Sequence, residues 1–201
     1  MNSKKQLEVF LSKLKQIENL KSELEQYPTP SNIAAEILWV AYMNGDIKNK
    51  IVADLGCGNG IFGIGSLLLE AKKVFFLDVE SASILVTKSN LTDLNLKNYI
   101  LLKENIENFK EKVDIVIQNP PFGVQKEHAD RIFLIKAMEN SKKIYSVHKV
   151  ESRLFIDALA KDYNFKLTNI LPFDFLLKKT QEFHTKQEYI IKTGCFILEK
   201  L

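Results

Sequence analysis

Two hydrophobic periodicities divide the chain. In residues 4–24 leucines and isoleucines recur at spacings of three and four, which predicts one face of an amphipathic helix. Thr29 followed by Pro30 indicates a helix N-cap and a proline at the first helical position. The apolar face of that second helix is formed by Ile33, Ala34, Ile37, Leu38 and Ala41. Gly45 and the following Asp46 end the second helix, so the first 50 residues are predicted to be helical.

After residue 50, short apolar runs alternate with helical patterns. The predicted strands cover residues 51–55, 74–77, 99–102, 113–117 and 144–147, and the helices between them cover 61–70, 81–94, 129–140 and 150–161. Such alternation predicts a parallel, doubly wound α/β sheet. The end of the chain differs, because Phe165–Phe175 and Gln187–Leu198 follow one another without a helix and indicate an antiparallel hairpin. We therefore expect a seven-stranded sheet over residues 51–201, with residues 1–50 as a helical extension that covers it.

Composition indicates an ordinary soluble globular protein of 201 residues, 46% of them apolar and 26% charged. No apolar run approaches the ~20 residues of a membrane span, and the charged start of the chain is unlike a signal peptide. Cys57 and Cys195 are far apart with no clustered histidines, which argues against a disulfide framework and against a protein-bound metal and fits a reducing cytoplasm. Residues 120–201 carry 14 Lys/Arg against 10 Asp/Glu. This bias suits a phosphate-bearing partner and equally suits a solvated lysine-rich surface.

A glycine loop follows the first predicted strand, in the segment 54–60 with sequence Asp-Leu-Gly-Cys-Gly-Asn-Gly. Glycines allow a tight turn and let a ligand lie against bare backbone, and the following helix offers unpaired N–H groups. Asp78, at the tip of the next strand, is positioned to accept from a ribose diol. Dinucleotide sites and S-adenosylmethionine (SAM) sites both combine a glycine loop with an acidic residue at the tip of the next strand. Three features favour SAM: the tight Gly-x-Gly-x-Gly spacing, the acidic Asp54, which suits a cationic ligand, and the antiparallel C-terminal hairpin.

The segment 119–122, Asn-Pro-Pro-Phe, ends the fourth predicted strand. Two consecutive prolines cannot continue a strand, so an amide and an aromatic ring are held on stiff backbone at the edge where open α/β sheets bind ligands. With the glycine loop, this motif resembles the class I SAM-dependent methyltransferases, over residues 51 to 201. In that superfamily the motif marks enzymes that methylate planar nitrogens: adenine N6, cytosine N4 or a glutamine amide. The resemblance implies a Rossmann-like sheet and a catalytic set of Asn119, Pro120, Pro121 and Phe122.

A closer resemblance covers nearly the whole chain. Gln26-Tyr27-Pro28-Thr29, the glycine loop, the Asn-Pro-Pro-Phe motif, His148-Lys149 and Phe183-His184 recur in that order in the archaeal and eukaryotic family that makes N6-methyladenosine in small-subunit ribosomal RNA. The resemblance implies that Gln26, Tyr27 and Thr29 close over SAM, and it places Asn105 where such enzymes usually carry an Asp. The expected cofactor contacts are Gln26, Tyr27, Thr29, Asp54, Gly56, Cys57, Gly58, Gly60, Asp78, Val79, Asn105, Ile106 and Asn119. The expected RNA contacts are Lys126, His148, Lys149, Lys178, Lys179, Phe183, His184 and Lys186.

The same resemblance implies a partner, a small zinc-binding activator protein that adds to the sheet on the side of its third strand. Two other functions fit the residues. A glutamine methyltransferase acting on a release factor uses the same motif, although such enzymes usually carry Tyr after the prolines and a separate N-terminal recognition domain. The second alternative is not an enzyme: the chain could be an RNA-binding assembly factor that binds SAM without transferring its methyl group.

Overall fold

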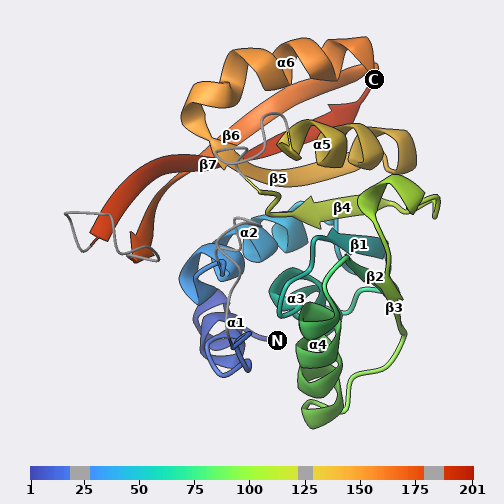
Figure 1. The fold of residues 1–201 in the computed structure, drawn as a ribbon, viewed down its shortest axis with the longest axis vertical. Helices are drawn as coiled ribbons and strands as arrows, with labels where there is room; N and C mark the ends of the chain where they lie inside the picture. Colours follow the sequence, from blue (N-terminus) through green and yellow to red (C-terminus); the bar gives the residue numbers. More distant parts are fainter. Residues whose placement is uncertain (19–27, 122–128, 179–187) are drawn as a thin grey trace.

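The computed structural model describes residues 1–18, 28–121, 129–178 and 188–201, and these form one α/β unit (Figure 1). The helices are α1 (Lys4–Leu11), α2 (Ser31–Met43), α3 (Ile61–Leu68), α4 (Ser81–Asp93), η2 (Ile106–Asn108), α5 (Ala129–Asn140), η3 (Val150–Ser152) and α6 (Arg153–Asp162). The strands are β1 (Ile51–Leu55), β2 (Lys73–Asp78), β3 (Tyr99–Lys103), β4 (Ile115–Gln118), β5 (Lys143–Lys149), β6 (Phe165–Lys178) and β7 (Glu188–Lys200). The predicted fold class is confirmed.

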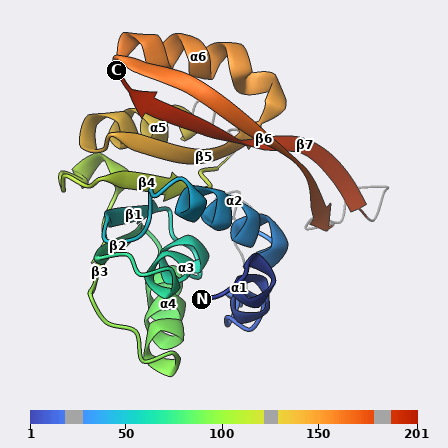
Figure 2. The ribbon, with the colours of Figure 1, turned by 180° about the vertical axis from the view of Figure 1, so that it is seen from behind.

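The seven strands form one sheet in the order β3-β2-β1-β4-β5-β7-β6. Strands β1 to β5 pair in parallel, whereas β7 runs antiparallel to both β5 and β6. The carboxyl end of β6 and the amino end of β7, which pair with each other, extend past the rest of the sheet (Figures 1 and 2). The chain order reverses between β1 and β4, so the loops that follow these two strands separate there and leave room for a ligand at the carboxyl edge.

Two hydrophobic cores cover the two faces of the sheet. One core joins α1, α2 and α3 to the sheet, and the other joins α5 and α6 to its opposite face. Leu7 and Leu11 of α1 lie in the first core, so the N-terminal helices pack on the same sheet as the rest of the chain. The boundary we placed at residue 50 stays a prediction. Among the residues described, none of the helices is both long and apolar enough to cross a lipid bilayer.

The first helix is shorter than predicted. It ends at Leu11, where the hydroxyl of Ser12 donates to the carbonyl of Val9, and the chain then leaves the helical path. The backbone of Lys15 pairs instead with the side chain of Asn90 on α4, donating N–H to Oδ1 at 2.9 Å and accepting from Nδ2 at 3.2 Å. Tertiary hydrogen bonds thus override the helical period in the described part of this segment, and residues 19–24 of the predicted helix lie outside the described residues.

Candidate functional site at the carboxyl edge of the sheet

The glycine loop has the backbone that its sequence predicts. Gly56, Gly58 and Gly60 have φ angles of +71°, +56° and +83°, a region that side chains with a Cβ rarely adopt. The amides of Gly56 and Cys57 both donate to the carbonyl of Leu77 on β2, at 2.8 and 2.9 Å, which ties the loop to the neighbouring strand. A Cβ at Gly58 would meet none of the described residues within 4 Å, so a ligand can approach the backbone at this residue.

Asp54 is a buried carboxylate at the end of β1, only 1% exposed. Its Oδ2 accepts from the amide of Gly63, in the first turn of α3, at 2.8 Å. Burial raises the pKa of this carboxyl well above 3.8, the bond from Gly63 opposes the rise, and the charge of Asp78 adds to it. A carboxylate held in this way is stabilised by a nearby cation.

Asp54→Asn separates the structural role of this residue from its charge. A folded-state pKa raised above the unfolded value means that the folded state loses stability as pH rises above about 3.8, and an Asn has no such titration. We expect the ligand-free variant to match or exceed the wild-type melting temperature near neutral pH, with a difference that closes toward pH 4. Its affinity for a cationic cofactor should fall roughly tenfold, the effect of losing about 1.4 kcal/mol of charge–charge interaction.

Differential scanning calorimetry across pH and isothermal titration with SAM measure the two effects. Asp174→Asn, at a carboxylate 59% exposed, is the matched control and should change neither. A variant that melts below the wild type at pH 7 would show that the charge of Asp54 stabilises the free protein.

Asp78 fixes the loop from the next strand. Its Oδ2 accepts from the amide of Gly58 and its Oδ1 accepts from the amide of Glu80, both at 2.9 Å. Burial raises its pKa, and the bonds from Glu80 and Gly58 oppose the rise. Each carboxylate oxygen keeps further lone pairs, so the expected bond to a ribose diol stays open as a prediction.

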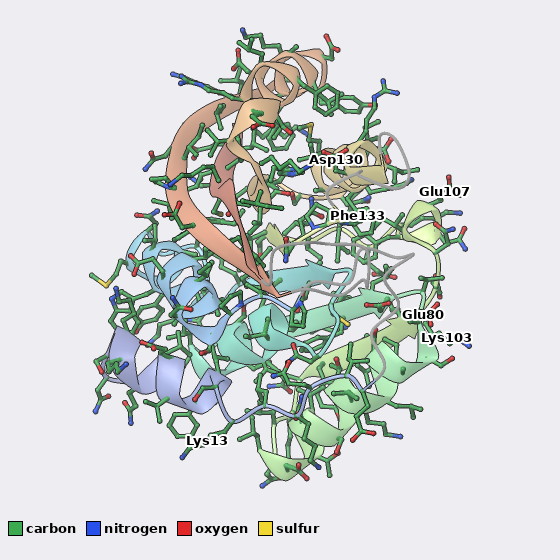
Figure 3. The ribbon with its side chains drawn as sticks, turned by 60° about the vertical axis from the view of Figure 1, so that its left-hand side comes forward. Lys13, Glu80, Lys103, Glu107, Asp130 and Phe133 are labelled. Atoms are coloured by element: carbon green, nitrogen blue, oxygen red, sulfur yellow. The ribbon has the colours of Figure 1, made fainter. Side chains whose placement is uncertain are left out.

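Residues after β2 and β3 complete this part of the edge. Val79 is 54% exposed and provides apolar surface next to Asp78, whereas Ile106 is 8% exposed and belongs to the core beneath the sheet edge. Asn105 is exposed, and its Oδ1 accepts from the amide of Glu107 and caps η2. Figure 3 shows Glu80 and Lys103 on the same side of the molecule as Asp130 and Phe133 of α5.

Helix α4 supports the loop with residues that the sequence analysis missed. Thr87 donates from its hydroxyl to the carbonyl of Gly58 at 2.9 Å, and Asn90 donates from Nδ2 to the carbonyl of Asn59 at 3.1 Å. Cys57 is buried, with its Sγ 3.8 Å from Oγ1 of Thr87, and burial raises its pKa well above 9.0, as expected of an unreactive thiol. Buried polar residues at helical spacing on α4 are the signal that could have identified this support.

The predicted catalytic amide lies directly after β4. Asn119 donates from Nδ2 to the hydroxyl of Thr29 at 3.0 Å. Its Oδ1 is buried and has no hydrogen-bond partner among the described residues. Thr29 therefore contacts Asn119 and is not the predicted N-cap, a position that Pro30 takes with no side-chain bond. Pro120 is buried after it, and Phe122 lies outside the described residues.

A buried chain of polar side chains lies beside Asn119. Gln118 donates from Nε2 to Oγ of Ser146 at 3.0 Å, and that oxygen lies 2.6 Å from Nε2 of His148. Nδ1 of His148 lies 3.4 Å from Oδ2 of Asp130 at the start of α5, without the alignment of a hydrogen bond. Burial acts to raise the pKa of Asp130, but the interactions with His148 and the hydrogen bonds from the backbone amides of Asp130 and Arg131 together outweigh it, and the net pKa is lowered. Asp130 thus stabilises the fold above about pH 3.8, and this contribution fades as pH falls below that value.

The expected RNA contacts are only partly within the described residues. His148 is 1% exposed, so its described contacts are structural and its predicted contact with RNA has no support here. Lys149 lies at the end of β5, and the backbone of Lys178 ends β6. The remaining expected RNA contacts, Lys126, Lys179, Phe183, His184 and Lys186, lie outside the described residues, as do the cofactor contacts Gln26 and Tyr27.

Residues 32–166 match the family model described as methyltransferase small domain. The chain belongs to this methyltransferase family. It is 38% identical to an uncharacterized protein of Methanocaldococcus jannaschii, with 100% of this chain and 96% of that protein covered. It is 32% identical to the rRNA N6-adenosine methyltransferase of Danio rerio, over 94% of each chain. A solved Pyrococcus horikoshii protein described as a candidate RNA methyltransferase is 41% identical, with a TM-score of 0.92 over 100% of this chain and 99% of that one.

Membership makes the chain a SAM-dependent methyltransferase, in which SAM supplies an electrophilic methyl group on a sulfonium. The residues at the carboxyl edge fit this cofactor. Gly58 presents backbone to open space, Asp54 offers a buried carboxylate to a cation, and Val79 exposes apolar surface beside Asp78. These residues would hold SAM, and Asn119 lies at the next strand, across the point where the chain order reverses.

Proposed function

We propose that the protein is an RNA adenine N6-methyltransferase that acts on ribosomal RNA, with the small subunit as the substrate particle. The observation that carries the proposal is the buried Oδ1 of Asn119, which lies after β4 at the edge that carries the glycine loop and has no partner within the described ranges. An acceptor without a partner suits an amino group, because an exocyclic N–H is a donor. The relatives named as rRNA N6-adenosine methyltransferases in Danio rerio and, at 28% identity, in Drosophila melanogaster support RNA as the substrate.

The proposed methyl transfer requires no strong general acid or base. The lone pair of the adenine amino nitrogen is delocalised into the ring, which makes that nitrogen a poor nucleophile. Accepting its two N–H groups at Oδ1 of Asn119 and at the carbonyl of Pro120 would favour localisation of the lone pair toward the methyl group. In such a transfer the N–C bond would form as the C–S bond of SAM breaks, S-adenosylhomocysteine would leave, and the methylated amino nitrogen would lose one proton to water. Phe122 would stack on the base, which must leave its helix to enter the site.

A methylation assay tests the proposal. Small-subunit RNA incubated with the protein and SAM labelled in the methyl group, then digested to nucleosides, should carry the label in N6-methyladenosine. Large-subunit RNA and a release factor with its target glutamine serve as competing substrates. Label in the protein amide, or none in N6-methyladenosine with or without an activator protein, would reject the proposal.

The free edge of β3 suits the activator that the family resemblance implies. Strand β3 pairs with β2 alone in the described part of the sheet, so its outer backbone groups can receive a strand from another chain. We expect the isolated chain to be poorly soluble or to bind SAM weakly, and co-expression with a small zinc-binding activator to improve both. Size-exclusion chromatography and SAM titration measure this. A lone chain that is monomeric, soluble and fully active requires no activator.

A further inference from the structure

One buried side chain on α4 bonds both to the glycine loop and to the chain that follows α1. Asn90 is 3% exposed, and its Nδ2 donates to the carbonyl of Asn59 at 3.1 Å and to the carbonyl of Lys15 at 3.2 Å. Its Oδ1 accepts from the amide of Lys15 at 2.9 Å. The partners fix the orientation of this side-chain amide, because a backbone N–H only donates and a backbone carbonyl only accepts. Asn90 therefore holds two separate backbone segments relative to each other.

The glycine loop also reaches the segment after α1 with a side chain of its own. Nδ2 of Asn59 donates to the carbonyl of Lys15 at 3.4 Å and to Oε1 of Gln16 at 3.3 Å. Asn59 is 8% exposed, whereas Lys15 and Gln16 lie at the surface. We call Lys15 and Gln16 the docked segment, since their described polar contacts with Asn59 and Asn90 attach them to the loop and to α4.

The bond from Asn90 falls on the part of the loop that faces the cofactor site. The peptide between Asn59 and Gly60 is held at both polar atoms, because its carbonyl accepts from Asn90 and its amide donates to the carbonyl of Cys57 at 2.8 Å. Gly58, one residue earlier, presents open backbone. Glycines allow many backbone conformations, so a bond that fixes one peptide favours a single conformation of the loop. Apparent affinity for SAM falls in proportion when the binding conformation is less populated.

We propose that Asn90 is a positioning residue that couples the binding of SAM to the docking of Lys15 and Gln16. The docked segment favours the loop conformation that binds SAM, and SAM in turn stabilises the docked segment, because coupling between two sites is reciprocal. The coupling concerns the cofactor and does not depend on which nitrogen receives the methyl group. It also differs from the contacts with SAM that the family resemblance implies for Gln26, Tyr27 and Thr29, since the docked segment acts through the protein.

Hydrogen exchange in the unmodified protein tests the coupling. The amide of Lys15 donates to Asn90, so it is protected while the segment is docked. Saturating SAM should slow its exchange about tenfold. The amide of Ile51 is the matched control, because it also donates to a side chain, Oδ2 of Asp114 at 2.8 Å, at the amino end of β1. SAM should leave exchange at Ile51 unchanged. No slowing at Lys15, or equal slowing at both amides, would overturn the proposal.

Lys15→Pro removes the N–H that donates to Asn90 and leaves the sequence of the glycine loop intact. Lys15→Ala is its control, because alanine keeps the N–H and loses the exposed side-chain bonds to Ser89 and Asp93. The dissociation constant for SAM, measured by calorimetry, should rise about tenfold in Lys15→Pro and less than about twofold in Lys15→Ala. With saturating SAM, kcat should stay within about twofold of the wild type in both variants. An unchanged affinity in Lys15→Pro would contradict the coupling.

Asn90→Ala and Asn140→Ala separate positioning from a loss of stability. Asn140 is a 5% exposed residue at the end of α5, and its Nδ2 donates to the carbonyls of Lys136 and Phe109 at 3.0 and 3.4 Å. Both variants should unfold at lower urea concentration than the wild type, and only Asn90→Ala should weaken SAM binding, by about tenfold.

The double variant Asn90→Ala with Lys15→Pro completes the cycle. If the segment acts through Asn90, adding Lys15→Pro should weaken SAM binding less than about twofold beyond Asn90→Ala alone. Additive losses in the double variant would show that the segment does not act through Asn90. Equal losses of SAM affinity in Asn90→Ala and Asn140→Ala would show that the effect is one of general stability, and either result would overturn the proposal.

Discussion

Asn119→Ala is expected to reduce kcat for RNA methylation by about 10²–10³-fold while the affinity for SAM stays within about twofold. Removing one preorganised hydrogen-bonding group from a site of developing charge typically costs this much. Oδ1 of Asn119 is buried and has no hydrogen-bond partner among the described residues, so under the proposed function it can accept from the nitrogen that is methylated. The side chain contributes one described hydrogen bond to the fold, the bond to Thr29, and we therefore expect little loss of stability. Single-turnover methylation of RNA and calorimetric titration of SAM measure the two quantities.

Asn119→Asp is the comparison variant. The carboxylate keeps an acceptor for the amino group, the bond to Thr29 must then be donated by the Thr29 hydroxyl, and the superfamily motif admits Asp at this position. Activity between that of the wild type and that of Asn119→Ala is the expected order. Equal rates in all three proteins would show that Asn119 does not contact the methyl acceptor, and a large loss of SAM affinity in Asn119→Ala would place this residue with the cofactor instead.

Much of the fold follows from local pattern. The bounds of β1 and α5 were predicted to the residue, because Ile51–Leu55 ends at the glycine loop and α5 ends at the polar residues after Asn140. The fourth strand begins at Ile115, two residues later than predicted, since the amide of Val113 donates to the carbonyl of Asn140 rather than to a strand. The predicted helix over 150–161 begins with the separate turn η3. The late start of β4 thus arises where a long-range hydrogen bond replaces a local one, whereas η3 is closed by the local bond from the amide of Arg153 to the carbonyl of Val150.

The site was predictable where one short segment carries the chemistry. The glycine loop and the position of Asn119 at a strand end follow from motif and order alone. The bond from Asn119 to Thr29 does not, because it depends on how α2 packs against the sheet. The hydrogen-bonded side chains of Gln118, Ser146 and His148 are only weakly indicated by the sequence. Ser146 and His148 are polar residues two apart in the interior of β5, between Ile144, Tyr145 and Val147, so both lie on one face of it.

Ser146→Ala is the second change with a large expected effect, and it acts on stability. The Oγ of Ser146 is the acceptor for Gln118 and the partner of His148, so its removal leaves two buried nitrogens unpaired. A buried polar group without a partner costs about 1–3 kcal/mol, so two such groups predict a loss of about 2–6 kcal/mol in the free energy of unfolding. Chemical denaturation with urea measures this loss.

Ser66→Ala is the matched control for Ser146→Ala, because both serines are 0% exposed. The hydroxyl of Ser66 donates to the carbonyl of Phe62 in its own helix at 2.8 Å, and no buried group in the described part of the chain uses it as an acceptor. We expect this variant to lose less than about 1 kcal/mol. Since Gln118 immediately precedes Asn119, Ser146→Ala should also lower kcat at temperatures where it remains folded, whereas Ser66→Ala should not. Equal losses in the two variants would mean that the hydrogen bonds joining Gln118, Ser146 and His148 add no more to the free energy of unfolding than one side-chain bond within a helix.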